Sequence, residues 1–173
     1  MSSVNKNSVL LFLPAKDFNE EEYSIIRRLL LKYGKNIFIT SDDHYVCSGS
    51  KGMKVKSDTS FYNIKIKNFS AMVLIGGKGS KAYWDNEKLC NIARNFNDAQ
   101  KIIGAICSAP VILAKAGILK NKSATCYYED KSELINLEIN YQDRAVVIDK
   151  NIVTSNGSQS AAQFTEAVLH LIK

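Results

Sequence analysis

The chain has 173 residues, of which 46% are hydrophobic and 23% are charged, and its formal net charge is +6 at pH 7. These values are typical of one soluble globular domain over residues 1–173, with a flexible N-terminus at 1–7. No apolar run approaches the roughly 18 residues of a membrane span, so we expect a cytoplasmic protein rather than a membrane protein.

Cysteine and lysine placement narrows the chemistry further. The four cysteines, Cys47, Cys90, Cys107 and Cys126, form no CxxC pair and have no histidine at metal-ligand spacing. We therefore expect neither a disulfide framework nor a metal site. The lysines fall on short strands and turns rather than along one helical stripe, which favours a solvated surface over a nucleic-acid interface.

Apolar periodicity and turn residues predict alternating elements in the first part of the chain, in the order strand 9–13, helix 19–33, strand 37–40, a hairpin or excursion at 45–55, strand 71–75 and a helix from 85 through 96. Asn19 and Asp85 are the predicted N-caps of the two helices, and Gly34 is the predicted stop of the first helix.

The second part predicts strand 101–106, helix 110–117, short strand 123–127, short helix 130–136, a hairpin of strands 145–148 and 152–155, and a final helix over 161–171. Strands that alternate with helices predict one α/β sandwich, a mainly parallel sheet with helices on both faces. Ligands bind at the carboxyl ends of the strands of such a sheet. Three loops leave from those ends: 14–19, 76–80 and the turn at Cys107.

Cys107 lies between the buried strand 101–106 and a helix whose first turn contains Pro110. Exposed backbone N–H groups at a helix start favour an anion, so we expect the thiol pKa to fall below about 8.5. One interpretation is a nucleophile on a strand–turn–helix elbow. The other is a small apolar residue that fills a tight turn.

Glu22 begins the buried stripe of the helix 19–33, together with Ile26, Leu29 and Tyr33. Either it completes a capping box with Asn19, or it faces Cys107 across the carboxyl edge of the sheet. In the second case burial raises the pKa of Glu22, and the two groups titrate as a coupled pair.

The Gly76-Gly77 pair follows a buried strand and allows close backbone approach, so the N–H groups there can face an oxyanion. The loop has neither the GxGxxG spacing of a dinucleotide site nor the GK[ST] of a P-loop. Nucleotide binding is therefore disfavoured.

Five motifs in order resemble the ThiJ/PfpI superfamily: the 18–22 segment, the 73–77 glycine loop, the 105–110 elbow, the 116–125 region and the 153–157 segment. The resemblance covers nearly the whole chain. It implies a three-layer sandwich of the flavodoxin-like, class I glutamine amidotransferase-like type, and a homodimer or higher homo-oligomer. It also implies a Cys107 nucleophile, a Glu22 partner, and backbone groups at Gly76, Gly77 and Ser108 around an oxyanion.

The chain departs from the superfamily at four positions. Ser108 stands where PfpI-type proteases have a His, and Lys81 stands where they have an acidic residue. Asn156 replaces a common Arg, and Tyr127 falls where many relatives have a His or Tyr. Tyr127 and Asn156 are therefore candidate pocket residues, and the chain is placed nearer the branch of the parkinsonism-associated protein deglycase.

Two function classes follow from the resemblance. The first is an enzyme in which Cys107 adds to a reactive aldehyde, such as methylglyoxal, and Glu22 shuttles the proton without a cofactor. A variant of it hydrolyses glycation adducts on protein side chains. The second class is a redox sensor or holdase chaperone with an oxidisable Cys107. A PfpI-type peptidase or amidase is a third, weaker reading.

The remaining cysteines, histidines and aromatic residues are predicted to have structural rather than catalytic roles. Cys90 is predicted to pack on its helix and Cys126 to line a strand. His44 and His170 are not expected to reach Cys107 within one chain, although a second subunit could supply His44. The aromatic pair Tyr83 and Trp84 is expected at an interface, or alternatively in the pocket.

Overall fold

The computed structural model describes residues 7–43 and 46–172, so the predicted flexible segment 1–7 lies outside it except for Asn7. Its centre is a seven-stranded sheet in the order β11-β12-β8-β7-β1-β3-β6. All neighbouring strands are parallel except β11 and β12, which are antiparallel. The strands are β1 (Ser8–Phe12), β3 (Asn36–Ser41), β6 (Thr59–Ser60), β7 (Ala71–Leu74), β8 (Ile102–Ile106), β11 (Val146–Asp149) and β12 (Ile152–Ser155).

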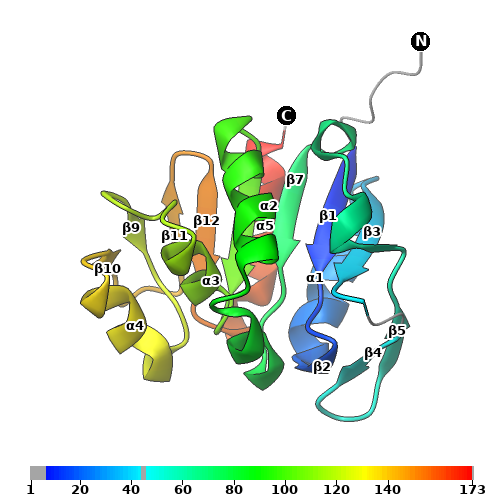
Figure 1. The fold of residues 1–173 in the computed structure, drawn as a ribbon, viewed down its shortest axis with the longest axis horizontal. Coiled ribbons are helices and arrows are strands. Elements are labelled where there is room, and N and C mark those ends of the chain that lie inside the picture. The colour runs from blue at the N-terminus through cyan, green and yellow to red at the C-terminus, as the bar shows by residue number, and fades with distance from the viewer. Residues whose placement is uncertain (1–6, 44–45, 173) are drawn as a thin grey trace.

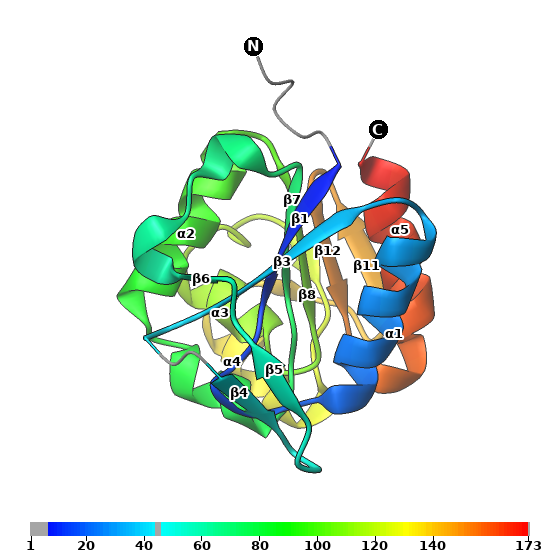
Figure 2. The same ribbon diagram turned by 90° about the vertical axis from the view of Figure 1, so that its right-hand side faces the viewer.

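Helices cover both faces of this sheet. One face carries α1 (Glu20–Lys32) and α5 (Ala161–Leu171), and the other carries α2 (Glu87–Asp98) and α3 (Pro110–Lys115) (Figures 1 and 2). The predicted three-layer α/β sandwich is confirmed, and the predicted main strands agree with the observed ones to within one or two residues. The single domain over 1–173 stays a prediction.

Two small sheets flank the central one. β2 (Lys16–Phe18) pairs with β4 (Val46–Gly49), which forms a hairpin with β5 (Lys54–Lys56), as expected for 45–55. The other small sheet pairs β9 (Ser123–Ala124) with β10 (Asn140–Tyr141), on either side of α4 (Lys131–Asn136). The predicted strand 123–127 therefore ends early, because the chain leaves the β9–β10 pair to pass the Cys107 turn.

Burial of β1 on both faces fixes the layers. Leu10 and Phe12 pack in the core under α2 and α3, whereas Val9 and Leu11 pack in the core under α1 and α5, and all four side chains are fully buried. A parallel strand that is covered on both sides must be apolar at successive positions. This explains the unbroken apolar run of the sequence.

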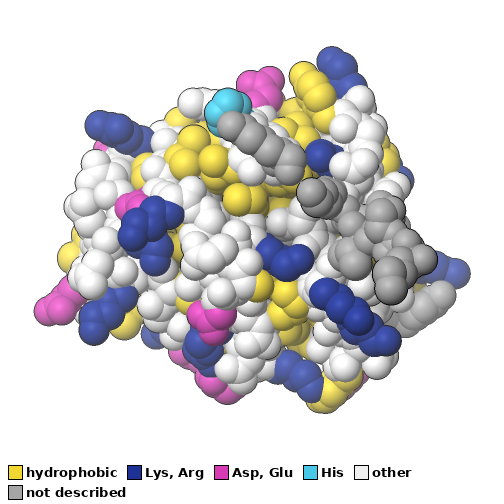
Figure 3. Space-filling view, turned by 90° about the horizontal axis from the view of Figure 1, so that it is seen from above, with side chains coloured by type: hydrophobic (Ala, Val, Ile, Leu, Met, Phe, Trp, Pro, Cys, Tyr) yellow, Lys and Arg dark blue, Asp and Glu magenta, His cyan; other side chains and the backbone are white. Residues whose placement is uncertain are grey.

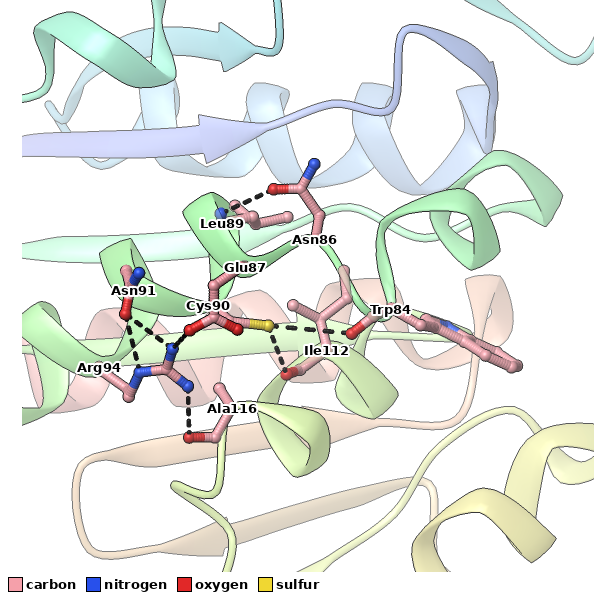
Figure 4. Close-up of polar contacts among 9 residues, drawn as sticks. All are labelled: Trp84, Asn86, Glu87, Leu89, Cys90, Asn91, Arg94, Ile112 and Ala116. Carbon is pink, nitrogen blue, oxygen red and sulfur yellow. Dashed lines mark hydrogen bonds and ion pairs between the residues drawn. The ribbon is translucent and has the colours of Figure 1, made fainter.

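The helix caps test the local predictions. Asn19 caps α1 as predicted, its side chain accepting a hydrogen bond from the Glu22 N–H at 3.0 Å. The predicted cap Asp85 is wrong by one residue: Asn86 caps α2 through the Leu89 N–H at 2.9 Å (Figure 4). Asp85 instead extends into solvent and approaches Lys115.

Cys90 packs inside α2, as predicted. Its sulfur lies 3.8 Å from the carbonyl oxygens of both Trp84 and Ile112 (Figure 4). Burial raises the pKa of this thiol, which therefore stays protonated and inert.

The sequence predicts that the basic residues are spread over the surface, and one face of the molecule can be compared with this prediction. On the face seen in Figure 3, Lys and Arg side chains are scattered among polar and apolar ones and form no continuous basic patch. None of the helices in the described part of the chain is long and apolar enough to cross a membrane. The cytoplasmic location stays a prediction.

Candidate active site

The candidate site lies at the carboxyl edge of the central sheet. There the loop after β7, the turn after β8 and the loop after β12 meet the start of α1. Parallel neighbouring strands bring their carboxyl ends to one edge, so segments distant in sequence converge. Cys107 occupies the turn directly after β8.

Cys107 has a φ of 63°, in the left-handed region that non-glycine residues rarely adopt. Its N–H donates to the Ser155 carbonyl at 2.9 Å, and its own carbonyl accepts from the Tyr127 N–H at 2.7 Å. Such backbone strain persists only where neighbouring contacts over-determine it. The turn therefore holds the half-buried sulfur in one position.

Glu22 is fully buried in the first turn of α1. Its Oε2 accepts from the Gly76 N–H at 3.0 Å, and its Oε1 lies 3.5 Å from the Ser158 hydroxyl. The Cys107 side chain lies beside it, since a Cβ added at Gly76 would come within 2.9 Å of the Glu22 Oε2 and 2.6 Å of the Cys107 Cβ. The predicted capping box is wrong, because the Asn19 N–H donates to the Gly76 carbonyl at 2.9 Å and leaves the Glu22 carboxylate to the sheet edge.

The pKa of Glu22 is raised from 4.5 to about 7, with burial as the largest cause. Hydrogen bonds from Gly76, Cys107 and Ser158 oppose the rise. Below pH 7 the group is therefore mostly neutral, and above it the group is a carboxylate held in an apolar wall.

The pKa of Cys107 is raised from 9.0 to about 12, first by burial and then by the charge of Glu22. Hydrogen bonds from the Gly77 and Ser108 backbones and from the Ser108 side chain act in the other direction. The expected lowering of this pKa is therefore wrong. The start of α3 therefore does not offset the desolvation of the buried sulfur and the charge of Glu22.

The backbone N–H groups of the glycine loop, Gly76 and Gly77, differ in their roles. The Gly76 N–H already donates to Glu22, so Gly76 is not available to an oxyanion, contrary to expectation. The N–H groups of Gly77 and Ser108 favour the anionic form of Cys107 and so oppose the rise of its pKa. They are the two remaining candidate oxyanion donors.

We expect Gly76→Ala to disrupt this site. A Cβ at position 76 would lie 2.5 Å from the Ile106 carbonyl oxygen, 2.6 Å from the Cys107 Cβ and 2.9 Å from the Glu22 Oε2. Overpacking of this kind costs about 1–3 kcal/mol. Thermal unfolding should show this loss, and alkylation of Cys107, followed by mass spectrometry, should change in rate.

Gly117→Ala is the matched control. Gly117 has a φ of 80° but nothing within 4 Å of an added Cβ, so the variant loses only about 1 kcal/mol of backbone preference. Its Cys107 alkylation should equal that of the wild type. Equal alkylation in the Gly76 variant would show that the loop does not position the thiol.

Two hollows meet at Cys107. One, of about 460 Å³, is walled by Tyr127, Asn156 and Cys126. The other, of about 430 Å³, is walled by Gly77, Ser108 and the lysines at its rim. A small carbonyl compound therefore has access to the sulfur from either side.

Sequence analysis missed several residues at this site. Cys126 lies in the hollow wall after β9 rather than in a strand. Ser158 reaches Glu22 from the loop after β12. Asp130, predicted only as a helix start, is buried and bonded to both Ser108 and Lys81. No local spacing signals these contacts, because they join residues far apart in the chain.

The remaining candidates lie elsewhere. Tyr83 is buried in the core and donates to Asp42, so an interface position is wrong for it. Trp84 is half-buried and donates from Nε1 to the Ser108 carbonyl at 2.9 Å. His170 lies in the last turn of α5, remote from the carboxyl edge, and His44 lies outside the described residues.

A family model described as the DJ-1/PfpI family matches residues 7–171. The deglycase PfpI of Pyrococcus furiosus is 35% identical over 146 residues, which cover 84% of this chain and 88% of that protein. A glutathione-independent glyoxalase of Caenorhabditis elegans is 24% identical over 97% of this chain and 90% of that protein. A crystal structure of a ThiJ/PfpI domain protein from Brachyspira murdochii, at 31% identity, superposes with a TM-score of 0.93 over 96% of both chains.

Proposed function

The chain belongs to the DJ-1/PfpI family, and from that premise we propose that it is a cysteine-dependent, cofactor-independent enzyme of stress protection that acts on reactive aldehydes or their adducts. Relatives named deglycase and glyoxalase support this class of substrate. The observation that carries the proposal is the fully buried Glu22, whose carboxyl group and the Cys107 side chain both lie against Gly76, and burial raises the pKa of this carboxyl to about 7.

The first chemical step forms a bond between sulfur and carbon. The Cys107 sulfur attacks the aldehyde carbon of a substrate such as methylglyoxal while the Glu22 carboxylate takes the thiol proton. The carbonyl oxygen becomes an oxyanion near the N–H groups of Gly77 and Ser108. The proton that Glu22 took from the thiol then passes to this oxyanion, which gives a hemithioacetal and restores the Glu22 carboxylate. A base with a pKa near neutrality suits a thiol that does not ionise by itself.

The second step moves two protons within the adduct. Glu22 removes the proton from the former aldehyde carbon and returns it to the neighbouring carbonyl carbon, while the hydroxyl proton on the former aldehyde oxygen passes to the neighbouring oxygen. This leaves a lactoyl thioester on Cys107. Water then hydrolyses the thioester, releases lactate and restores the thiol. The sum is methylglyoxal plus water giving lactic acid, so neither an oxidant nor a reductant is consumed.

A second form of the proposal takes early glycation adducts on protein side chains as substrates. The same pair would attack the aldehyde-derived carbon and release the free side chain. The hollow beside Tyr127 and Asn156 is open enough to admit a side chain. Release of arginine or lysine from methylglyoxal adducts, measured beside lactate formation, separates the two forms.

The sensor or holdase alternative receives less support. Oxidation proceeds through the thiolate, and burial together with Glu22 raises the pKa of Cys107. Rapid sulfinate formation at Cys107 without any aldehyde turnover would favour the sensor. A PfpI-type peptidase is supported least, since Ser108 holds the histidine position and the one described histidine, His170, lies in the last turn of α5.

The pH profile of turnover tests the role of Glu22. Because the carboxylate form is the base, kcat/KM for methylglyoxal should rise with pH through an apparent pKa near 7 and then level off. Stopped assays of lactate across this range measure it. A profile that is flat through neutrality, or one that falls there, would contradict the assignment.

The homo-oligomeric state stays a prediction, which size-exclusion chromatography with light scattering can check.

A further inference from the structure

A second set of polar side chains lies next to Cys107. It begins at Ser108 and does not include Glu22. The Ser108 Oγ lies 2.5 Å from the Asp130 Oδ2, and the Asp130 Oδ1 lies 2.6 Å from the Lys81 Nζ. Ser108 is 2% exposed and Asp130 is 3% exposed. We call these three residues the Ser108 chain. A buried carboxylate is expensive unless it is paired and hydrogen-bonded, and here it is both.

The Ser108 chain is fastened to the Cys107 turn at several points. The Asp130 N–H donates to the Tyr127 carbonyl at 2.9 Å, and the Tyr127 N–H donates to the Cys107 carbonyl at 2.7 Å. Trp84 holds the Ser108 carbonyl from the other side. The position of the hydroxyl relative to the sulfur is therefore fixed by the backbone.

A serine hydroxyl has one hydrogen to donate but two lone pairs that accept. Two acceptors lie near the Ser108 hydroxyl: the Asp130 carboxylate, at 2.5 Å, and the sulfur of the adjacent residue Cys107, which lines the same hollow as Ser108. Both cannot receive the hydrogen at once. A neutral thiol is a weak acceptor and an anionic sulfur is a strong one, so the charge on sulfur decides the direction.

We propose that the Ser108 hydroxyl is a two-position donor, which points to Asp130 while Cys107 is a thiol and turns to the sulfur when that sulfur becomes anionic. Lys81 neutralises Asp130 in both positions. Ser108 keeps its own proton throughout, because the proton that leaves sulfur goes to Glu22. Ser108, Asp130 and Lys81 are positioning residues in this account, which rests on the proposed role of Cys107 as nucleophile.

Charged groups converge on the sulfur from several elements. Glu22 belongs to α1, and Lys81 belongs to the 3₁₀ segment Lys78–Tyr83. Glu129 and Asp130 belong to the segment after β9. The titratable groups at the site are Glu22 and Asp130 and, in the walls of the two hollows, Glu21, Lys78, Lys81, Cys126, Tyr127, Tyr128, Glu129, Tyr141 and Asp143. Of these, Asp130 is the one that is bonded to the Ser108 hydroxyl, so changes at Asp130 should act on the sulfur through Ser108.

The test measures the rate of Cys107 alkylation by iodoacetamide against pH, with mass spectrometry of the full chain. Ser108→Ala removes the donor and should slow alkylation at neutral pH about tenfold. Asp130→Asn removes the charge of the competing acceptor and one of its two acceptor oxygens, and should speed alkylation about tenfold. Opposite effects from two bonded partners are not expected of a merely structural contact, whose loss would change both rates in one direction.

Two further variants keep the test decisive. Asp149→Asn is the matched control, since Asp149 also accepts a structural hydrogen bond, from the Ser123 N–H at 2.8 Å, but lies at the other edge of the sheet. It should leave alkylation unchanged. If Asp130→Asn does not fold, Lys81→Met serves instead, because the loss of Lys81 leaves the Asp130 charge unneutralised, which strengthens Asp130 as the competing acceptor and should slow alkylation several-fold.

The readout separates this proposal from the enzymatic one. Slower alkylation in Ser108→Ala with faster alkylation in Asp130→Asn supports the two-position donor, even if methylglyoxal is not turned over. Unchanged rates in Ser108→Ala, or slowing in Asp130→Asn, overturn it, even if the wild type proves to be a glyoxalase. With Lys81→Met, a rate equal to that of Asp149→Asn overturns it in the same way.

Discussion

Cys107→Ala is expected to abolish lactate formation from methylglyoxal, with a fall in kcat/KM of about 10³-fold or more. The sulfur forms the bond to substrate, and no neighbouring group replaces it as nucleophile. The fold should survive, because the side chain is half-buried and its neighbours are held by backbone hydrogen bonds. Lactate production measures the loss of activity, and circular dichroism of the variant measures whether the fold is retained.

Cys126→Ala is the matched control for that loss. Cys126 lies in the wall of the same hollow, and burial raises the pKa of its thiol to about 12. This variant should retain turnover to within about tenfold, since it removes one buried sulfur without touching the Glu22 contact. Turnover that survives in Cys107→Ala and disappears in Cys126→Ala would move the nucleophile to the wrong side of the hollow for Glu22 and end the proposed mechanism.

Glu22→Gln is expected to reduce kcat/KM by about 10²- to 10⁴-fold at neutral pH, the usual range for loss of a general base. The amide can still accept from the Gly76 N–H, so the start of α1 keeps its contact with the glycine loop. The rise of activity near pH 7 should vanish in this variant. Activity close to that of the wild type would exclude Glu22 as the base.

The same variant changes how stability depends on pH. The folded-state pKa of Glu22, about 7, lies above the ordinary value of 4.5, so the folded protein binds more protons between these values. Wild-type stability is therefore highest below pH 4.5, as far as this group is concerned, and falls as pH rises through 7. The total is about 3 kcal/mol, since one pKa unit corresponds to about 1.4 kcal/mol.

In Glu22→Gln this fall should be absent, so the variant should be more stable than the wild type above pH 7. Chemical denaturation at several pH values measures the free energy of unfolding directly. Glu87→Gln, in the exposed first turn of α2, is the control and should follow the wild type in both stability and turnover. A wild-type stability curve that rises between pH 5 and 8 relative to Glu22→Gln would contradict the burial of this carboxyl.

Local sequence patterns were sufficient for the scaffold. Both faces of β1 are covered, which demands the apolar run at 9–13, and Asn19 satisfies an otherwise free N–H at the start of α1. Pro110 suits the first turn of α3 because no N–H is needed there. These features depend on near neighbours in the chain, so the order of strands and helices and the Cys107 turn could be predicted.

The tertiary structure decided which residues of the site are hydrogen-bonded to one another and how their pKa values shift. Of the two alternatives for Glu22, the capping box does not form, because its carboxylate accepts from the Gly76 N–H, 54 residues away, and Ser108 bonds to Asp130, 22 residues on. The pKa of Cys107 rose rather than fell, because desolvation and a neighbouring charge outweighed one turn of helix. The sequence by itself determined which residues reach the carboxyl edge of the sheet. Which of them touch, and which of them hold a proton, depends on long-range packing and the water it excludes, and no local spacing encodes either.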